Sequence, residues 1–141
     1  MGMEQTVTFP AGSLPSWSAA RDLLSSRGVQ MPVRMIDGEL AFPDEEPPEN
    51  WRELRLGTHD GMIVTVRREP DRVVLMVWGN ADARLVQVWN WLTWAFADAG
   101  NGTIHTADGP KLAAEYWSRM NLLADAGGNL GRGVFGSRDP T

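Results

Sequence analysis

Few residues of this 141-residue chain are of types that carry out chemistry. There is no cysteine, which excludes thiolate nucleophiles, disulfides and cysteine-ligated metals. Of the two histidines, His59 precedes Asp60 in an expected turn, and His105 has Asp108 three residues on. Adjacent side chains seldom face each other as a general base requires, and a metal needs three or four converging ligands. We therefore predict no catalytic residue, no metal site and no cofactor.

Two short motifs have the residues of a ligand-binding loop but not its expected surroundings. Residues 131–136 fit the dinucleotide pattern Gly-x-Gly-x-x-Gly, which works only between a strand and the start of a helix. Here the pattern follows an expected helix, and five residues remain after it. Gly79-Asn80 joins a strand to a helix, where Asn80 is expected to cap the helix. Neither motif predicts a nucleotide site.

An acidic segment is the first feature with functional meaning. Residues 43–50 contain three prolines and four acids, so they are expected to form an ordered or a mobile surface loop. Such a run is usually solvated, but it can also meet a basic partner and steer the encounter. Trp51 follows directly, either as an anchor for a partner or as a pin to the core. The interaction candidates here are Asp44, Glu45, Glu46, Glu49 and Trp51.

The helix expected over residues 81–99 is unusually apolar. It has no charged residue between Arg84 and Asp98, and it carries three of the seven tryptophans. Trp91 and Trp94 fall far from the helix's main apolar stripe, on what would ordinarily be its wet side. Three interpretations stay open. The C-terminal helix covers them, which is the commonest fate of aromatic residues; they form a dimer or partner interface; or they line an apolar ligand pocket.

Composition limits the classes of partner. The net charge of −5 disfavours binding to nucleic acid or to anionic lipid, and only Arg67-Arg68 and Arg72 gather positive charge. The longest apolar stretch is too polar to span a membrane alone. No signal peptide is visible at the N-terminus, so a cytoplasmic location is expected.

Hydrophobic periodicity and turn residues predict the fold class. Asp37-Gly38 between two β-prone runs predicts a hairpin, because both turn residues need positive φ. Residues 54–56, the alternating run 62–68 and the run 73–78, which is apolar on both faces, are separated by turn residues and predict a three-strand antiparallel meander. Helices are expected over 17–27, with Gly28 as a left-handed stop, over 81–99, and from Pro110 onward. The expected fold is α+β: an antiparallel sheet of about five to six strands, with three helices packed mainly on one face.

Residues 1–126 are expected to form one domain, and the glycine-rich residues 127–141 a flexible tail. The leading hypothesis is a non-enzymatic interaction protein, acting as a homodimer or on a basic protein partner. A small acidic inhibitor of immunity or antitoxin type would be one form, by analogy only. The alternative is a small-ligand-binding domain with a tryptophan-lined pocket. An enzyme of unknown class that uses His59, Asp60 and His105 is the third hypothesis.

Overall fold

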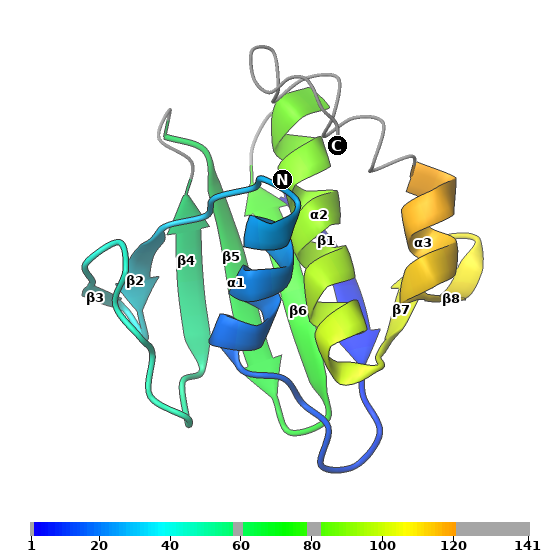
Figure 1. The fold of residues 1–141 in the computed structure, drawn as a ribbon, viewed down its shortest axis with the longest axis horizontal. Helices are drawn as coiled ribbons and strands as arrows, with labels where there is room; N and C mark the ends of the chain where they lie inside the picture. Colours follow the sequence, from blue (N-terminus) through cyan, green and yellow to red (C-terminus); the bar gives the residue numbers. More distant parts are fainter. Residues whose placement is uncertain (1, 58–60, 79–82, 121–141) are drawn as a thin grey trace.

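The computed structural model describes residues 2–57, 61–78 and 83–120 (Figure 1). Its three helices are α1 (Trp17–Ser26), α2 (Ala83–Gly100) and α3 (Ala113–Met120). Its strands are β1 (Gly2–Thr8), β2 (Val33–Ile36), β3 (Glu39–Leu40), β4 (Glu53–Gly57), β5 (Ile63–Glu69), β6 (Arg72–Trp78), β7 (Thr103–Thr106) and β8 (Gly109–Leu112).

All eight strands form one antiparallel sheet in the order β3-β2-β4-β5-β6-β1-β7-β8. The three helices lie on the same face of this sheet, with α2 against β6 and β1 and α3 over β7 and β8 (Figure 1). The predicted α+β class, the antiparallel sheet and the three helices are confirmed. The predicted five to six strands were too few.

The C-terminal strand β8 is the element that was assigned to the wrong structure. Pro110 was expected in the first turn of a helix, but it pairs with His105 across a hairpin, and the helix begins at Ala113. The turn closes because the Thr106 hydroxyl donates to the Gly109 carbonyl at 2.8 Å and accepts from the Asp108 amide at 3.2 Å. Proline is tolerated here because β8 is an edge strand.

The predicted chain reversals are confirmed. Asp37 and Gly38 have φ values of 51° and 86°, as a two-residue hairpin turn requires. Gly28 has φ 81°, and the Val29 amide donates to the Leu24 carbonyl at 2.9 Å, which is the expected helix stop. Three further predictions lie outside the described residues: the helix cap at Asn80, the turn with His59 and Asp60, and the tail 127–141.

The sheet has an inner face under the helices and an outer face on which no described helix lies. Neighbours in the strand register share a face, so Val7, Leu75 and Val66 are inner residues. Thr6, Val74 and Arg67 are outer residues by the same rule. β6 is apolar on both faces, which is typical of a strand that is covered on both sides.

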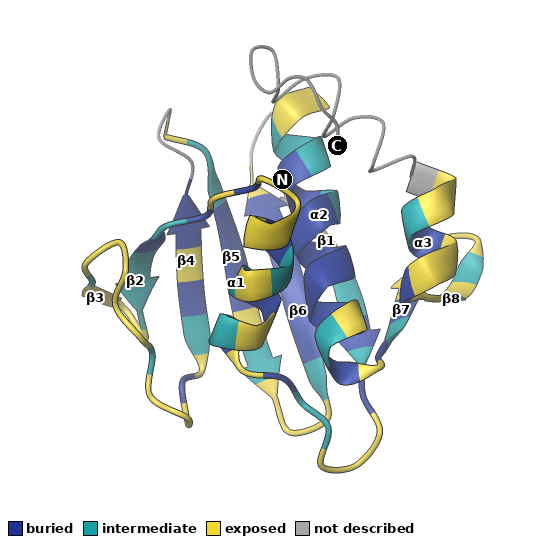
Figure 2. Cartoon of the chain, in the orientation of Figure 1, coloured by how far each residue is buried: buried dark blue, intermediate teal, exposed yellow. Residues whose placement is uncertain are grey.

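The core lies between the inner face and α2. The Phe96 ring packs between Trp17 and Trp51, with centroid distances of 6.1 and 6.4 Å. The Trp89 indole N–H donates to the Leu75 carbonyl at 2.9 Å, so this buried polar group is satisfied. Figure 2 shows α2 buried over most of its length, while β3 and the loop after it are exposed. None of the described helices combines the length and low polarity that crossing a bilayer requires.

Candidate protein-binding surface

The β3 edge of the sheet exposes apolar and acidic side chains together. Leu40 is 88% exposed and Phe42 is 75% exposed, the two highest values among the large hydrophobic residues described as exposed. Asp44, Glu45 and Glu49 follow within the next seven residues and are exposed as well. We call these five residues the acidic edge. It occupies the left-hand side of the molecule in Figure 2.

Backbone contacts hold both ends of the loop that carries the acidic edge. At the start, the Val33 amide donates to the Pro43 carbonyl at 3.1 Å. At the end, one carboxylate oxygen of Asp37 accepts from the Arg52 and Glu53 amides, both at 2.8 Å. The loop is therefore tied to the β2–β3 hairpin at two points.

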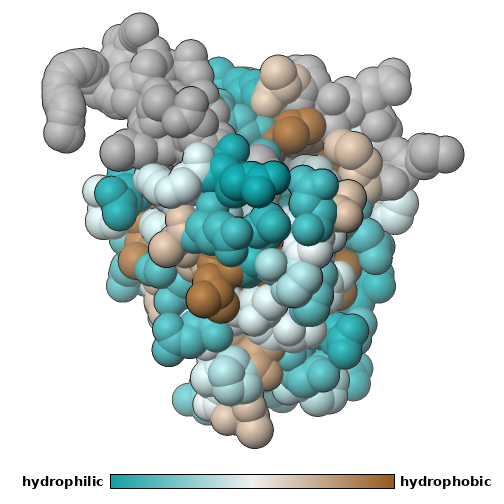
Figure 3. Space-filling view, turned by 90° about the vertical axis from the view of Figure 1, so that its right-hand side faces the viewer, coloured by the Kyte–Doolittle hydropathy of each residue, from teal (hydrophilic) through white to brown (hydrophobic). Residues whose placement is uncertain are grey.

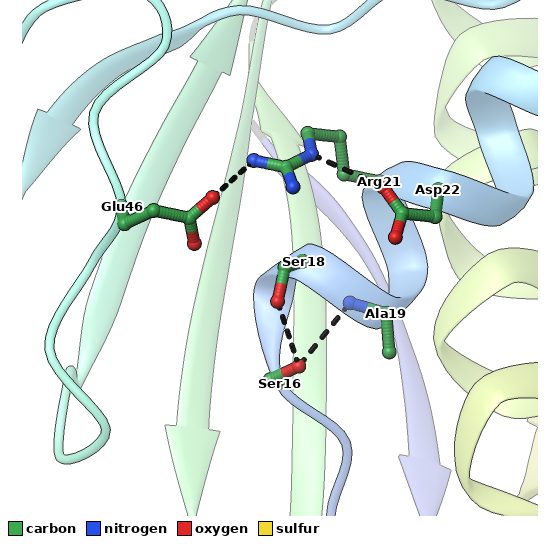
Figure 4. Close-up of polar contacts among 6 residues, drawn as sticks. All are labelled: Ser16, Ser18, Ala19, Arg21, Asp22 and Glu46. Atoms are coloured by element: carbon green, nitrogen blue, oxygen red, sulfur yellow. Dashed lines mark hydrogen bonds and ion pairs between the residues drawn. The ribbon is translucent and has the colours of Figure 1, made fainter.

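Two of the loop's acids are already engaged. The Glu45 carboxylate accepts from the Phe42 amide at 3.0 Å, a contact that fixes the backbone at the exposed phenylalanine. The Glu46 carboxylate binds the Arg21 guanidinium of α1, which also contacts Asp22 (Figure 4). The hydrogen bond that the Arg21 guanidinium donates to the Glu46 carboxylate raises the pKa of Arg21. Glu46 therefore docks the loop against α1.

Trp51 pins the loop to the core, which was one of the two roles considered for it. Its side chain is 2% exposed, so it offers almost no surface to a partner. The Arg68 guanidinium lies 4.4 Å from the Trp51 ring centroid, and it donates to the Trp51 carbonyl at 2.8 Å and to the Glu49 carbonyl. Burial lowers the pKa of Arg68. This arginine is thus a second clamp on the loop.

Two surface hollows flank this clamp. One, of about 450 Å³, lies between residues 14–18 at the start of α1 and residues 46–49 of the loop. The other, of about 580 Å³, lies between residues 50–53 and 67–70. Leu14, Trp51 and Arg68 line both. Neither hollow is the ligand pocket predicted from the sequence, which was expected between the sheet and the tryptophan-bearing helix α2.

Trp91 and Trp94 belong to the interior. They are 2% and 4% exposed, and the Trp94 ring lies 4.5 Å from the ring of Trp117 on α3. The Arg27 guanidinium lies over both rings of that pair, at 5.7 and 4.8 Å. The C-terminal helix therefore covers Trp94, as the first interpretation expected, and neither tryptophan presents surface to a partner in this structure.

His105, the histidine candidate within the described residues, lies apart from the acidic edge. Its ring nitrogen Nε2 is 2.9 Å from the Thr8 hydroxyl on the outer face of the sheet. Asp108, considered as its carboxylate, instead contacts Arg119 at 3.3 Å. Among the residues that the structure describes, no three His, Asp or Glu side chains are close enough together to hold a metal ion.

Leu40 and Phe42 were not among the sequence-predicted site residues. Both sit in a β-prone run, which ordinarily indicates partial burial. Their exposure follows from the position of β3 at the end of the sheet, which hairpin patterns do not reveal. A signal was present in that Phe42 directly precedes the proline-rich acidic segment, where a strand must end.

No family model matches the chain, and no curated protein or solved structure matches it either.

Proposed function

We propose that this protein is a binding protein whose acidic edge takes a basic protein partner. The observation that carries the proposal is that one short segment exposes two large apolar side chains, Leu40 and Phe42, together with several acids. Apolar side chains supply burial at the centre of an interface. Acids around them speed the approach of a basic partner and exclude acidic ones.

The free charges of the acidic edge support a basic partner. Asp44 and Glu49 form no ion pair through their carboxylates with any described residue. Their charges are thus available at the surface, whereas that of Glu46 is neutralised by Arg21. A partner presenting lysine or arginine around an apolar depression would complement both features of the edge.

The clamps on the loop support the proposal as well. Ordering a loop on binding costs free energy, so a loop that is held in place before binding gives tighter association. Asp37, Trp51 and Arg68 hold this loop in the unbound protein. A small acidic inhibitor that occupies the functional surface of a basic protein would be one form of such a binder.

Site-specific photo-crosslinking in the producing cells tests the proposal. A photoreactive phenylalanine analogue at position 42 should capture a partner, and the same analogue at the exposed position 114 on α3 should not. The captured protein should carry a net positive charge. Capture should fall at least tenfold in Asp44→Lys/Glu49→Lys, because the steering charge is reversed. Equal capture at both positions, or an acidic captured protein, would contradict the proposal.

A small-ligand function is the second candidate, favoured by the two hollows beside Trp51 and Arg68. Each has a volume within the range of small-molecule sites, which is roughly 300–1,000 Å³. Titration with a defined panel of metabolites, followed by amide NMR, tests it. Saturable shifts confined to residues 14–18 and 46–53 would support a ligand in the hollows, and shifts at Leu40 and Phe42 alone would not.

A further inference from the structure

The open edge of β3 cannot pair with a further strand beyond Leu40, and this determines the kind of partner that fits the acidic edge. We infer that the partner is a folded basic protein whose surface has a depression for the Leu40 and Phe42 side chains. Glu45 sets this mode of binding, because it occupies the backbone groups of Phe42 to which an added strand would bind. The inference rests on the proposed function and narrows its partner from any basic polypeptide to a folded one.

The hairpin fixes the direction of each backbone group along this edge. Ala41 donates its amide to the Arg34 carbonyl of β2 at 3.1 Å. Neighbouring residues of a strand point their backbone groups to opposite sides, so those of Leu40 and Phe42 point away from β2. An added strand reaches only these two residues, because β3 directly follows the hairpin turn and Pro43 has no amide hydrogen.

Glu45 binds both backbone groups of Phe42. Its carboxylate accepts from the Phe42 amide at 3.0 Å, and its own amide donates to the Phe42 carbonyl at 3.0 Å. Leu40 is then the one residue of this edge whose outward amide and carbonyl bind no described residue. A peptide that extends a sheet gains its affinity from a row of main-chain hydrogen bonds, and a single residue is too short a row. Very short strands and prolines protect sheet edges in the same way.

The side chains of the edge are available where its backbone is not. Leu40 and Phe42 are 88% and 75% exposed, and the exposed acids Asp44 and Glu49 follow them. Projecting apolar side chains leave water only when a partner surrounds them, and the acids favour basic residues around that contact. An extended peptide would have to order itself around them without main-chain bonds, which costs free energy. A folded protein is already ordered, so it is the occupant that the edge favours.

Paired variants of Glu45 test the inference. The probe is the protein captured by the photoreactive analogue at position 42, purified in its folded form, and calorimetry measures its dissociation constant. Glu45→Gln keeps an oxygen that accepts from the Phe42 amide and should bind within about threefold of the wild type. Glu45→Ala releases the Phe42 backbone, so the dissociation constant should rise roughly fivefold or more. Unchanged hydrogen exchange at the Arg52 and Glu53 amides checks that the end of the loop stays tied in both variants.

Strand addition makes the opposite prediction for these variants. A free Phe42 amide would lengthen the row of main-chain bonds, so Glu45→Ala would then bind more tightly than Glu45→Gln. The two modes thus differ in the sign of the effect, which a merely structural role of Glu45 does not reverse.

Two matched leucines separate side-chain contact from backbone contact. Leu40→Ala keeps the outward amide and removes the side chain, and it should weaken binding roughly tenfold or more. Leu112 is 63% exposed on β8, the edge strand at the other end of the sheet. Figure 3 views the molecule from the side of α3 and β8, where hydrophobic residues form small separate patches among hydrophilic ones. Leu112→Ala should therefore leave binding unchanged.

Short overlapping peptides that cover the captured protein complete the test. Each should bind roughly tenfold or more weakly than the folded protein, because each has to be ordered on binding. A peptide that binds more tightly than that, a tolerated Leu40→Ala, or a Glu45→Ala variant that binds at least as tightly as Glu45→Gln would overturn the inference and leave the basic partner in place. No capture at position 42, or capture of an acidic protein, would overturn both proposals.

Discussion

The tryptophan-bearing side of α2 has the composition of an interface but is buried, whereas the acidic edge has few aromatic residues and is exposed. The first is rich in the aromatic residues that interfaces favour, yet Trp91 and Trp94 are almost completely buried. The second has one aromatic residue, and Phe42 is 75% exposed. The difference arises from position: α2 lies between α1 and α3 over the middle of the sheet, and Phe42 follows its edge strand.

Residue type thus predicts burial well in the middle of this fold and poorly at the edge of its sheet. A helix covered by neighbours on several sides can be apolar nearly all round without being an interface. At the end of a sheet there is no further strand to cover a side chain. An exposed aromatic residue there is a better indication of binding than three buried ones.

The largest expected effect comes from a matched pair of phenylalanines. Phe96→Ala should lower the free energy of unfolding by about 3–5 kcal/mol, since it leaves a cavity between Trp17 and Trp51. Phe42→Ala should change it by less than about 0.5 kcal/mol, since the side chain is mostly in water. Urea unfolding followed by circular dichroism measures both. A large loss in Phe42→Ala would mean that the acidic edge is part of the core.

A second effect comes from Tyr116, the only tyrosine of the chain. Its hydroxyl lies 2.7 Å from the Gln5 side-chain oxygen and 2.8 Å from that of Asn90, and burial raises its pKa to about 12. In the unfolded chain the tyrosine hydroxyl ionises near pH 10. Between pH 10 and 12 the folded state therefore keeps the proton on Tyr116, while the unfolded state loses it. The stabilisation that Tyr116 contributes should be fully present below pH 10. The free energy of unfolding should then fall by about 2–3 kcal/mol between pH 10 and 12.

Urea unfolding at a series of pH values measures this decline. Tyr116→Phe is the control, because it keeps the ring and removes the ionisable group. The variant should lose most of the pH dependence between 10 and 12. An identical decline in the variant would show that other groups cause it.

A smaller effect is expected at the link between hairpin and loop. Asp37→Ala removes the acceptor for the Arg52 and Glu53 amides and places alanine at positive φ, so it should cost about 1–2 kcal/mol. Asp37→Asn keeps a side-chain oxygen and tolerates positive φ, and should cost less than about 0.5 kcal/mol. Hydrogen exchange of the Arg52 and Glu53 amides should accelerate in the alanine variant only.

The smallest effect is expected for the surface ion pair of the loop. Arg21→Gln should lower the free energy of unfolding by less than about 1 kcal/mol, because Glu46 is exposed and Arg21 is partly exposed, so water screens the ion pair. The difference from the wild type should shrink further in 0.5 M salt, where exposed charges are screened. A larger, salt-independent loss would show that Glu46 organises the loop more strongly than the ion pair alone accounts for.

The sequence predicted those turns, helix ends and helix faces that depend only on neighbouring residues. The Asp37-Gly38 turn, the Gly28 helix stop and the apolar stripe of α2 each depend on residues within a few positions of one another. Pro110 was misassigned because a proline starts a helix or sits in an edge strand equally well. The candidate site depended on strand order, which no local pattern encodes, so Leu40 and Phe42 were missed.

The place of β1 in the sheet has a consequence for how the chain folds. β1 precedes the other described strands in the sequence, yet it lies between β6 and β7, so Gly2 pairs with Trp78 and Thr6 pairs with His105. These neighbours are about seventy and one hundred residues further along the sequence, so β1 cannot complete its pairing until β7 has been synthesised. Loops of that length form slowly, and topologies rich in distant pairings fold slowly as a class. Until β7 emerges, the hydrogen-bonding edge of β1 stays open to unwanted pairing.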